Sequence, residues 1–137
     1  MIWRKLLRRK PLNDWPYPNF SKEEMACKCG CGGLPEHSFM RRLQALRDTV
    51  GFPLPVTSGF RCPEYNNQVS STGRHGPHTT GRAVDLGVSR RKAYEVVDEC
   101  FGLGFTGIGV AQKGGGRFVH LDDLEIPAYP RPTIWSY

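Results

Sequence analysis

Residues 58–85 read SGFRCPEYNNQVSSTGRHGPHTTGRAVD, and residues 117–122 read RFVHLD. Together the two stretches supply two imidazoles and one carboxylate, those of His78, Asp85 and His120. Zinc in catalytic sites is typically held by three ligands of this kind, which leave the fourth coordination position for water. The two stretches therefore predict that these three side chains meet around one cation.

The apolar pattern around Asp85 and His120 indicates how the ligands reach one point. Residues 82–88, RAVDLGV, are predicted to form a strand, whose alternation places Asp85 on the opposite face from Val84 and Leu86. A carboxylate inside an apolar strand is costly to bury unless it is paired or bound to a metal. His120 likewise stands between two apolar residues of a second predicted strand. If the two strands are antiparallel neighbours, both side chains face one site, and the histidine of the preceding loop completes it.

Arg61 follows a predicted strand over residues 54–60, at a strand end of the kind where loops carry functional groups on a rigid base. It is a candidate partner for a substrate anion. From the residues alone, two alternatives to a metal site stay open. A histidine in a strand is more often a hydrogen-bonded core residue than a ligand. Asp85, for its part, has Arg82 and Arg61 as alternative partners to a cation.

The chain as a whole is predicted to form one α+β domain over residues 1–137. Its 16 glycines and 11 prolines indicate a loop-rich protein rather than a helical bundle. We expect a small antiparallel sheet with two main helices packed on it. A basic and aromatic segment (residues 1–20) precedes this body and packs along it. A proline-rich and aromatic tail (residues 123–137) follows and lies across the surface with Trp135 packed in.

Helix signals mark the predicted main helices. Apolar residues recur at helical spacing over residues 35–50, and again after Ser89, which is a good N-cap. The apolar stripe of the second helix is Ala93, Val96, Val97, Cys100 and Phe101. A short helix is predicted over residues 63–69, and residues 21–24 have capping-box spacing for a helical turn. The predicted strands are residues 54–60, 82–88, 107–110 and 117–121.

The charge balance favours anionic partners. Lys and Arg number 19 against 13 Asp and Glu, which gives a net charge of +6 and a pI near 9.3. Such a balance suits nucleic acid, a membrane surface or an anionic cell-wall polymer, and it serves solubility equally well. No run approaches the ~18 apolar residues of a membrane span. The basic N-terminus lacks the apolar segment of a secretory signal, so we expect synthesis in the cytoplasm.

The chain has five cysteines, an odd number that favours free thiols or ligands over a disulfide framework in a reducing compartment. Cys27, Cys29 and Cys31 follow a C-x-C-x-C pattern. Structural zinc sites normally space their ligands as C-x2–4-C, and no clear second pair follows downstream. A glycine-rich turn with partly buried thiols is therefore favoured over a metal site. Cys100 is expected in the core.

Three motifs, SGFRCPEYN, H-x-x-G-R-A-V-D-L and F-V-H-L-D, occur in this order between residues 34 and 122. In them the chain resembles the zinc D-alanyl-D-alanine carboxypeptidase and L-alanyl-D-glutamate endopeptidase family, which cuts peptidoglycan stem peptides and includes bacteriophage endolysins. The resemblance implies that His78, Asp85 and His120 bind Zn2+. It implies that Arg61 holds a substrate carboxylate or steadies the developing oxyanion.

The chain departs from the family pattern at three positions. Gly76 stands where a serine usually precedes the first histidine by two residues. Arg117 and Gly115 stand where members place a catalytic Glu or Asp, or a histidine, before the last histidine. The general base is therefore not assigned by motif. Asp122, on the same side of its strand as the last histidine, and His75, in the loop beside the first, are the two candidates.

The resemblance thus implies a zinc-dependent hydrolase that cleaves amide bonds of the peptidoglycan stem peptide, expected to be a monomer without a nucleic-acid partner. An endolysin, which reaches the wall after the membrane is permeabilised, is the expected setting. Carboxypeptidase and endopeptidase members share the metal motifs, so the bond that is cut stays open. Two alternatives are kept: a zinc-bearing cell-wall binding module without catalysis, and a basic nucleic-acid-binding protein that uses the cysteines and the basic N-terminal arm.

Overall fold

The computed structural model describes residues 13–137 of the chain. Residues 1–12 of the predicted N-terminal segment lie outside the described residues. The rest of that segment packs against the domain, with Tyr17 and Phe20 buried. The indole Nε1 of Trp15 donates a hydrogen bond to the carbonyl oxygen of Phe20 at 2.6 Å. The aromatic side chains that precede the first helix thus extend the core.

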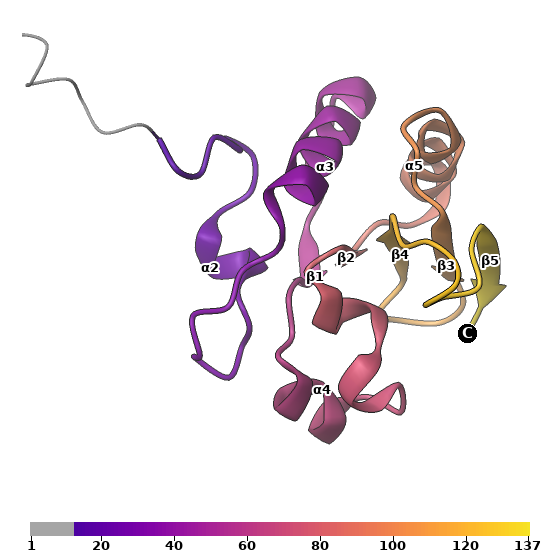
Figure 1. Ribbon diagram of the computed structural model, residues 1–137. Helices are drawn as coiled ribbons and strands as arrows, with labels where there is room; N and C mark the ends of the chain where they lie inside the picture. The colour runs from indigo at the N-terminus through magenta and orange to yellow at the C-terminus, as the bar shows by residue number, and fades with distance from the viewer. Residues whose placement is uncertain (1–12) are drawn as a thin grey trace, which may run out of the picture.

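The centre of the fold is a five-stranded sheet in the order β1-β2-β4-β3-β5. Its strands are β1 (Val56–Ser58), β2 (Ala83–Leu86), β3 (Gly107–Ala111), β4 (Phe118–Asp122) and β5 (Thr133–Ser136). The pairings are antiparallel except that between β3 and β5, so the sheet is mixed and mostly antiparallel. The fold is therefore α+β, as predicted, and Figure 1 shows the sheet open at both edges.

The tail contributes a strand that the sequence analysis did not predict. β5 pairs in parallel with β3, with Trp135 opposite Gly109. Pro127, Pro130 and Pro132 obscure the strand signal, because proline is disfavoured inside strands. All three lie before β5 begins, which leaves its β-prone sequence TIWS free to pair.

The helices within residues 13–137 are α2 (Lys22–Met25), α3 (His37–Val50), α4 (Pro63–Val69) and α5 (Arg90–Gly102). They occur where the sequence predicted them, although α3 begins at His37 rather than at Pro35. The loop between α4 and β2 contains two 3-10 turns, η1 (Gly73–His75) and η2 (Pro77–Thr80). None of these helices has the length and apolarity that crossing a bilayer requires.

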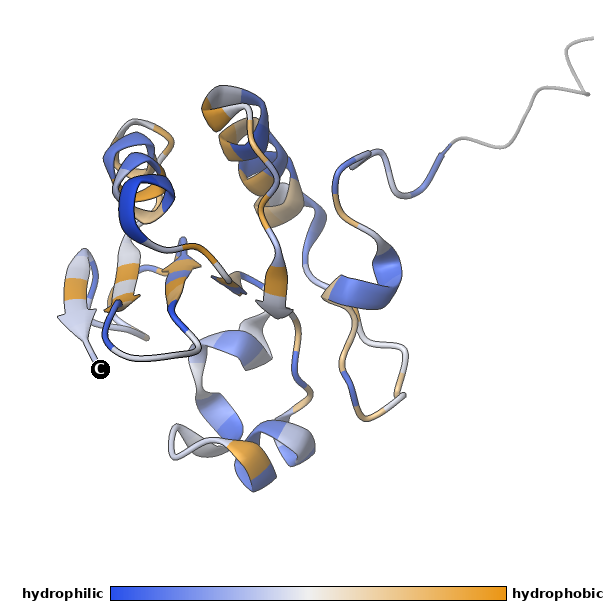
Figure 2. Cartoon of the chain, turned by 180° about the vertical axis from the view of Figure 1, so that it is seen from behind, coloured by the Kyte–Doolittle hydropathy of each residue, from blue (hydrophilic) through white to orange (hydrophobic). Residues whose placement is uncertain are grey.

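The core lies between the sheet and the two long helices. Figure 1 shows α3 and α5 side by side above the sheet in that view, with α4 below it, and Figure 2 shows apolar residues along both helices. The buried residues contributed by the two helices and by the sheet are Phe39, Met40, Leu43, Leu46, Ala93, Val96, Cys100, Val84, Leu86, Ile108, Val119 and Leu121. The helices thus cover one face of the sheet and leave its other face for the site.

Two details of α5 differ from the prediction. Ser89 stands at the N-cap, but its side chain makes no capping hydrogen bond. Phe101 is 58% exposed rather than part of the buried stripe, and it borders a surface hollow with Ile108 and Ile134. Cys100 is fully buried, as expected.

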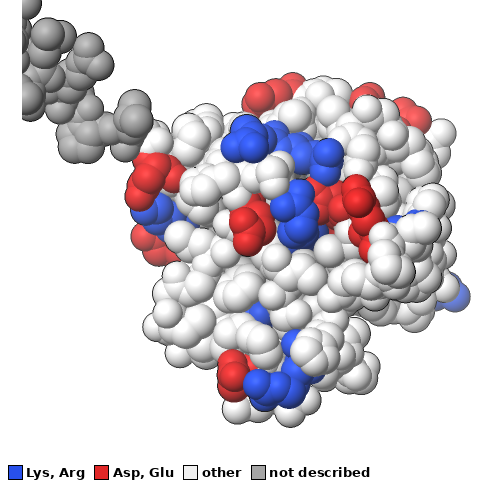
Figure 3. Space-filling view, in the orientation of Figure 1, with Lys and Arg blue, Asp and Glu red and all other residues white. Residues whose placement is uncertain are grey.

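The net charge is concentrated at the N-terminus of the sequence. Residues 1–12 contain five of the 19 basic residues and none of the 13 acidic ones, so residues 13–137 carry a net charge of +1. Figure 3 shows basic and acidic side chains interleaved over one face of the domain. That face lacks the single-signed basic surface that phosphate-backbone binding uses.

Candidate metal centre

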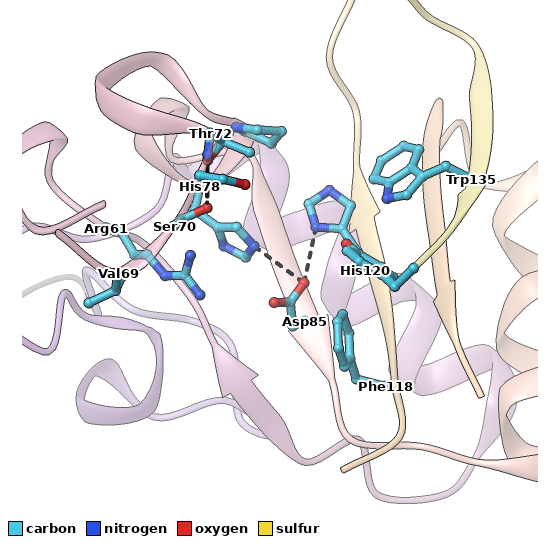
Figure 4. A pocket seen from close by; sticks show the side chains of 12 residues that line it. Arg61, Val69, Ser70, Thr72, His78, Asp85, Phe118, His120 and Trp135 are labelled. Atoms are coloured by element: carbon cyan, nitrogen blue, oxygen red, sulfur yellow. Dashed lines mark hydrogen bonds and ion pairs between the residues drawn. The ribbon is translucent and has the colours of Figure 1, made fainter. Parts of the chain in front are cut away.

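Asp85 of β2 and His120 of β4 are direct partners in the antiparallel pairing of the two strands. Their neighbours Val84 and Leu121 enter the core, so the two polar side chains leave the sheet on the face opposite α3 and α5. His78 lies in η2 and approaches from the loop, with its ring centroid 5.1 Å from that of His120. Figure 4 shows the three side chains converging. The structure therefore brings together the three residues that the sequence singled out.

The ligand atoms of this group have the spacing of a metal site. Asp85 Oδ1 lies 3.3 Å from His78 Nε2 and 3.0 Å from His120 Nδ1. All three candidate ligand atoms lie within 4.8 Å of one another. Two ligands bound tetrahedrally to zinc at about 2.1 Å stand about 3.4 Å apart. The observed distances therefore suit a shared zinc ion.

The outer nitrogens of both imidazoles are held by acceptors. His78 Nδ1 lies 2.8 Å from the carbonyl oxygen of Gly59, and His120 Nε2 lies 2.8 Å from Asp122 Oδ2. Because a carbonyl and an ionised carboxylate only accept hydrogen bonds, these outer nitrogens carry the protons. The inner nitrogens therefore direct lone pairs toward Asp85 Oδ1, which is an acceptor too. Three acceptors that face one point repel one another until a cation lies among them, so the donor set fits zinc.

The electrostatics of the group also favour a positive charge at this point. Burial opposes the negative charge of Asp85, yet its close contacts with the imidazoles of His120 and His78 outweigh burial and hold its pKa well below the ordinary value. Burial by itself lowers the pKa of His120, but the neighbouring carboxylates of Asp122 and Asp85 raise the pKa above the ordinary value. Asp85 is therefore a carboxylate at neutral pH, the form in which it binds a metal.

The alternative partners proposed for Asp85 do not pair with it in the structure. Arg82 forms a two-pronged ion pair with Asp123, its Nε and Nη2 lying 2.8 and 2.7 Å from the two carboxylate oxygens. Arg61 donates instead to Asn66 Oδ1, at 3.1 Å from Nη1. Asp85 is thus left with the two imidazoles.

Asp122 lies fully buried beneath His120 at the end of β4. Both of its oxygens accept hydrogen bonds from Arg131, whose Nε and Nη2 lie 2.9 and 2.8 Å away, and Oδ2 also faces His120 Nε2. Burial raises the pKa of Asp122, but Arg131 and His120 outweigh burial and lower it to about 2. Gly107 makes this packing possible, because a Cβ there would overlap the Asp122 carboxylate. Asp122 is therefore an ionised group that orients His120.

Arg61 is held toward the candidate ligands by a buried amide. Asn66 of α4 is fully buried, accepts from Arg61 Nη1 and donates through Nδ2 to Thr72 Oγ1 at 2.9 Å and to the carbonyl of Gly73. Figure 4 shows the guanidinium beside His78. Asn66 thus links α4 to the loop that carries the histidine and fixes the direction of Arg61.

The other positions considered in the sequence lie away from the ligands. His75 is exposed, and its carbonyl oxygen accepts a hydrogen bond from the Tyr129 hydroxyl at 2.8 Å. Arg117 turns back onto the glycine-rich turn, where its Nε donates to the carbonyl of Gly114 at 3.0 Å. Neither residue lines the pocket described next.

The three candidate ligands and Arg61 open into one pocket of about 350 Å³. The pocket is lined by Arg61, Val69, Ser70, Ser71, Thr72, Pro77, His78, Asp85, Phe118, His120, Trp135 and Tyr137. Trp135 of β5 packs against His120, with ring centroids 5.1 Å apart, and Gly109 leaves room for its indole. The volume of the pocket suits part of a short peptide, and the Trp135 indole keeps bulk water from one side of the His120 ring.

Three parts of this site were not predicted from the sequence: Asn66, Arg131 and the aromatic wall from β5. The alternating glycines of β3 were an available signal, because glycine inside a strand often marks a close approach of another group. Arg131 left no such signal, since its partner Asp122 is joined to it by an irregular proline-containing segment.

The family model described as Peptidase M15 matches residues 18–122. The matched range contains all three candidate ligands, Arg61 and Asp122. No curated protein and no solved structure matches the chain. Because the family model covers more than half of the sequence, the chain belongs to the Peptidase M15 family, whose members are zinc-dependent metallopeptidases of the D-Ala-D-Ala carboxypeptidase type.

Proposed function

We propose that this chain is a zinc-dependent peptidase that hydrolyses an amide bond of the peptidoglycan stem peptide, of the D-Ala-D-Ala carboxypeptidase or L-Ala-D-Glu endopeptidase type. The single observation that carries the proposal is the convergence of three acceptor atoms on one point in the wall of a pocket that also holds Arg61. Membership of the M15 family supplies the substrate class.

Arg61 binds the substrate in this proposal. Stem peptides carry free carboxylates, at the terminal D-alanine and on D-glutamate, and a guanidinium offers a planar fork that matches a carboxylate. Because Arg61 is held by the neutral amide of Asn66 and not by an acid, its positive charge stays available to the substrate. When Arg61 binds the substrate carboxylate, the direction of its guanidinium places the adjoining amide bond of the substrate beside the three candidate metal ligands.

His78, Asp85 and His120 would hold the zinc ion, which when bound supplies Lewis-acid polarisation of the scissile carbonyl and lowers the pKa of water. Gly59 and Asp122 keep both imidazoles in the tautomer that presents an inner lone pair. The ligands are therefore oriented before any substrate arrives, which reduces the reorganisation that the reaction requires.

The geometry assigns no residue as the general base of the reaction. Asp122 and His75 were the predicted candidates, and the geometry favours Asp122 as a positioning residue, because Arg131 and His120 occupy its oxygens. Of the described residues that line the pocket, the carboxylate and the imidazoles are all candidate ligands. That observation supports a second candidate function, a zinc-bearing wall-binding module without catalysis.

We place the site of action at the cell wall, where the family's substrate lies. Access to the wall after the membrane is permeabilised, as for endolysins, belongs to the same proposal.

Digestion of purified muropeptides, followed by mass analysis, tests the proposal. The wild-type chain is expected to release either the terminal D-alanine or the fragment that begins at D-glutamate, and the product identifies the bond. A chelator should stop the release, added zinc should restore it, and His120→Ala should abolish it. Undiminished release in the chelator would refute the zinc mechanism. Binding to purified walls without any product would instead favour the wall-binding module.

A further inference from the structure

Four cysteines from two distant segments meet beside the Arg61 wall of the pocket. Cys27, Cys29 and Cys31 lie in the loop between α2 and α3, and Cys62 is the N-cap residue of α4. Their sulfur atoms all lie within 4.8 Å of one another. The C-x-C-x-C pattern has no second cysteine pair downstream, because the fourth cysteine stands alone, 31 residues after Cys31.

The distances between the sulfur atoms are those of shared ligands rather than of disulfides. Cys29 Sγ lies 3.3 Å from Cys27 Sγ and 3.6 Å from Cys62 Sγ, and all four cysteines are free thiols. A disulfide has its sulfurs about 2.05 Å apart. Four sulfurs bound tetrahedrally to zinc at about 2.3 Å stand about 3.8 Å apart. The cluster is therefore already close to tetrahedral zinc geometry.

The loop is shaped to bring its three cysteines together. In an extended strand, Cys27 and Cys31 would stand about 13 Å apart. Gly30 and Gly32 instead adopt left-handed backbone angles, with φ of 85° and 81°, which fold the chain back on itself. A hydrogen bond from the amide of Cys27 to the carbonyl of Gly33, at 3.1 Å, closes the loop.

Backbone amides point at two of the sulfurs. The amide of Cys62 donates to Cys27 Sγ at 3.3 Å, and the amide of Tyr65 donates to Cys62 Sγ at 3.4 Å. Such bonds offset part of the negative charge that thiolate ligands bring, and they orient the ligands in the way outer partners do at metal sites. The Lys28 side chain donates to the carbonyl oxygen of Thr57 at 2.8 Å, so its ammonium group is directed away from the four sulfur atoms.

We propose that Cys27, Cys29, Cys31 and Cys62 bind a structural zinc ion, separate from the ion held by the histidines. Four thiolates in tetrahedral arrangement select zinc and leave no open position for water or substrate, which is the hallmark of a structural site. Because Cys62 follows Arg61 directly, this ion ties the substrate-binding wall to the loop before α3. The amide of Phe60, which donates to the carbonyl of Met25 at 2.9 Å, joins the same two segments.

Zinc content per chain tests the proposal. The full chain, purified with a reductant, is expected to contain two zinc ions. The double variant Cys29→Ser/Cys31→Ser should contain one, and so should His120→Ala, which removes the other site. Cys100→Ala, which removes a buried thiol outside the cluster, is the matched control and should keep both ions. A double variant that retains the zinc content of the wild type would overturn the proposal.

Cobalt substitution keeps the test informative even where the double variant does not fold. His120→Ala loaded with Co2+ should show the intense near-ultraviolet absorption of cobalt–thiolate bonds, because its cysteine site is intact. Absence of that absorption, or a disulfide among the four cysteines in the reduced chain, would overturn the proposal. Since this variant lacks the predicted hydrolysis, the result for the cysteines is independent of whether the enzyme proposal holds.

Discussion

The guanidinium of Arg61 is fixed by a neutral partner, and this detail decides what the residue can do. An acid in the place of Asn66 would neutralise the charge of Arg61. The Asn66 amide instead fixes the direction of the guanidinium and leaves its positive charge available to a ligand. Asn66 is itself locked by Thr72 and Gly73, so the arrangement is rigid. A fixed fork of this kind selects a carboxylate over a single-point anion.

Arg61→Lys is therefore expected to weaken substrate binding more than it slows the reaction of bound substrate. Losing a charge-assisted, two-pronged contact of about 1.5–3 kcal/mol corresponds to a rise in KM of about 10–100-fold. Steady-state kinetics on a purified muropeptide measure it. Arg74→Lys is the matched control, because Arg74 is exposed and pairs with Glu64 at 2.9 Å. An unchanged KM in Arg61→Lys would remove Arg61 from substrate binding.

At the scale of single residues, the sequence was informative where the chemistry conflicts with the surroundings. Asp85 and His120 are polar residues within apolar strands, and this pattern indicated a shared site on the condition that the two strands were antiparallel neighbours. Asn66 was not identified, because a polar residue in a short helix is unremarkable until its burial is known. The roles assigned to the ligands and to Arg61 stay predictions.

The alternation of side chains along the strands places the polar residues of the site on one face of the sheet. His120 and Asp122 are two residues apart on β4 and so share a face, and the glycines of β3 opposite them leave that face open. Trp135 of β5 then packs against His120, and Arg131, which lies just before β5, pairs with Asp122. The sequence predicted the four antiparallel strands because each has its own apolar pattern. The fifth strand forms only because β3 offers it an edge, which is information that local patterns lack.

The ion pair between Arg131 and Asp122 ties β5 to β4, and we expect the fold to lose this tie in acid. The pKa of Asp122 is about 2, below its ordinary value of 3.8. A carboxyl whose pKa is lowered on folding stabilises the fold above its unfolded pKa, so the stabilisation is lost as the pH falls from about 4 toward 2. Lowering the pKa from 3.8 to about 2 corresponds to about 2–3 kcal/mol, to which the contacts with Arg131 and His120 both contribute.

Urea unfolding of the chelator-treated chain between about pH 5 and pH 2 measures this loss. Asp122→Asn is expected to be less stable than the wild type at pH 5 and to depend less steeply on pH, because the titrating group is gone. Asp98→Asn, on the surface of α5, serves as the control and should follow the wild type. Parallel curves for Asp122→Asn and the wild type would show that this pair does not contribute.

At the scale of the whole molecule, contacts between distant segments produced what the sequence could not show. The α+β class and the order of elements as far as β4 follow from local periodicity, whereas the cysteine cluster depends on residues 27–31 meeting residue 62. The +6 charge is likewise misleading when averaged over the chain. Residues 13–137 carry only +1, so the excess belongs to residues 1–12.

Removing residues 1–12 should therefore weaken attachment to the anionic cell wall without altering catalysis on a small substrate. At low salt the full chain, at +6, is expected to bind and digest intact walls better than the truncated chain, at +1, and this advantage should fade as salt screens the charges. Both chains should cleave a soluble muropeptide at the same rate, since the pocket residues lie outside the deleted segment.

A full-length control with Gln at Arg4, Lys5, Arg8, Arg9 and Lys10 separates charge from chain length, and it should behave like the truncation. Equal salt dependence in the full and truncated chains would show that the basic segment has no part in holding the wall. Salt-sensitive binding of DNA or RNA by the full chain, undiminished in His78→Ala, would support nucleic acid as the partner of that segment instead.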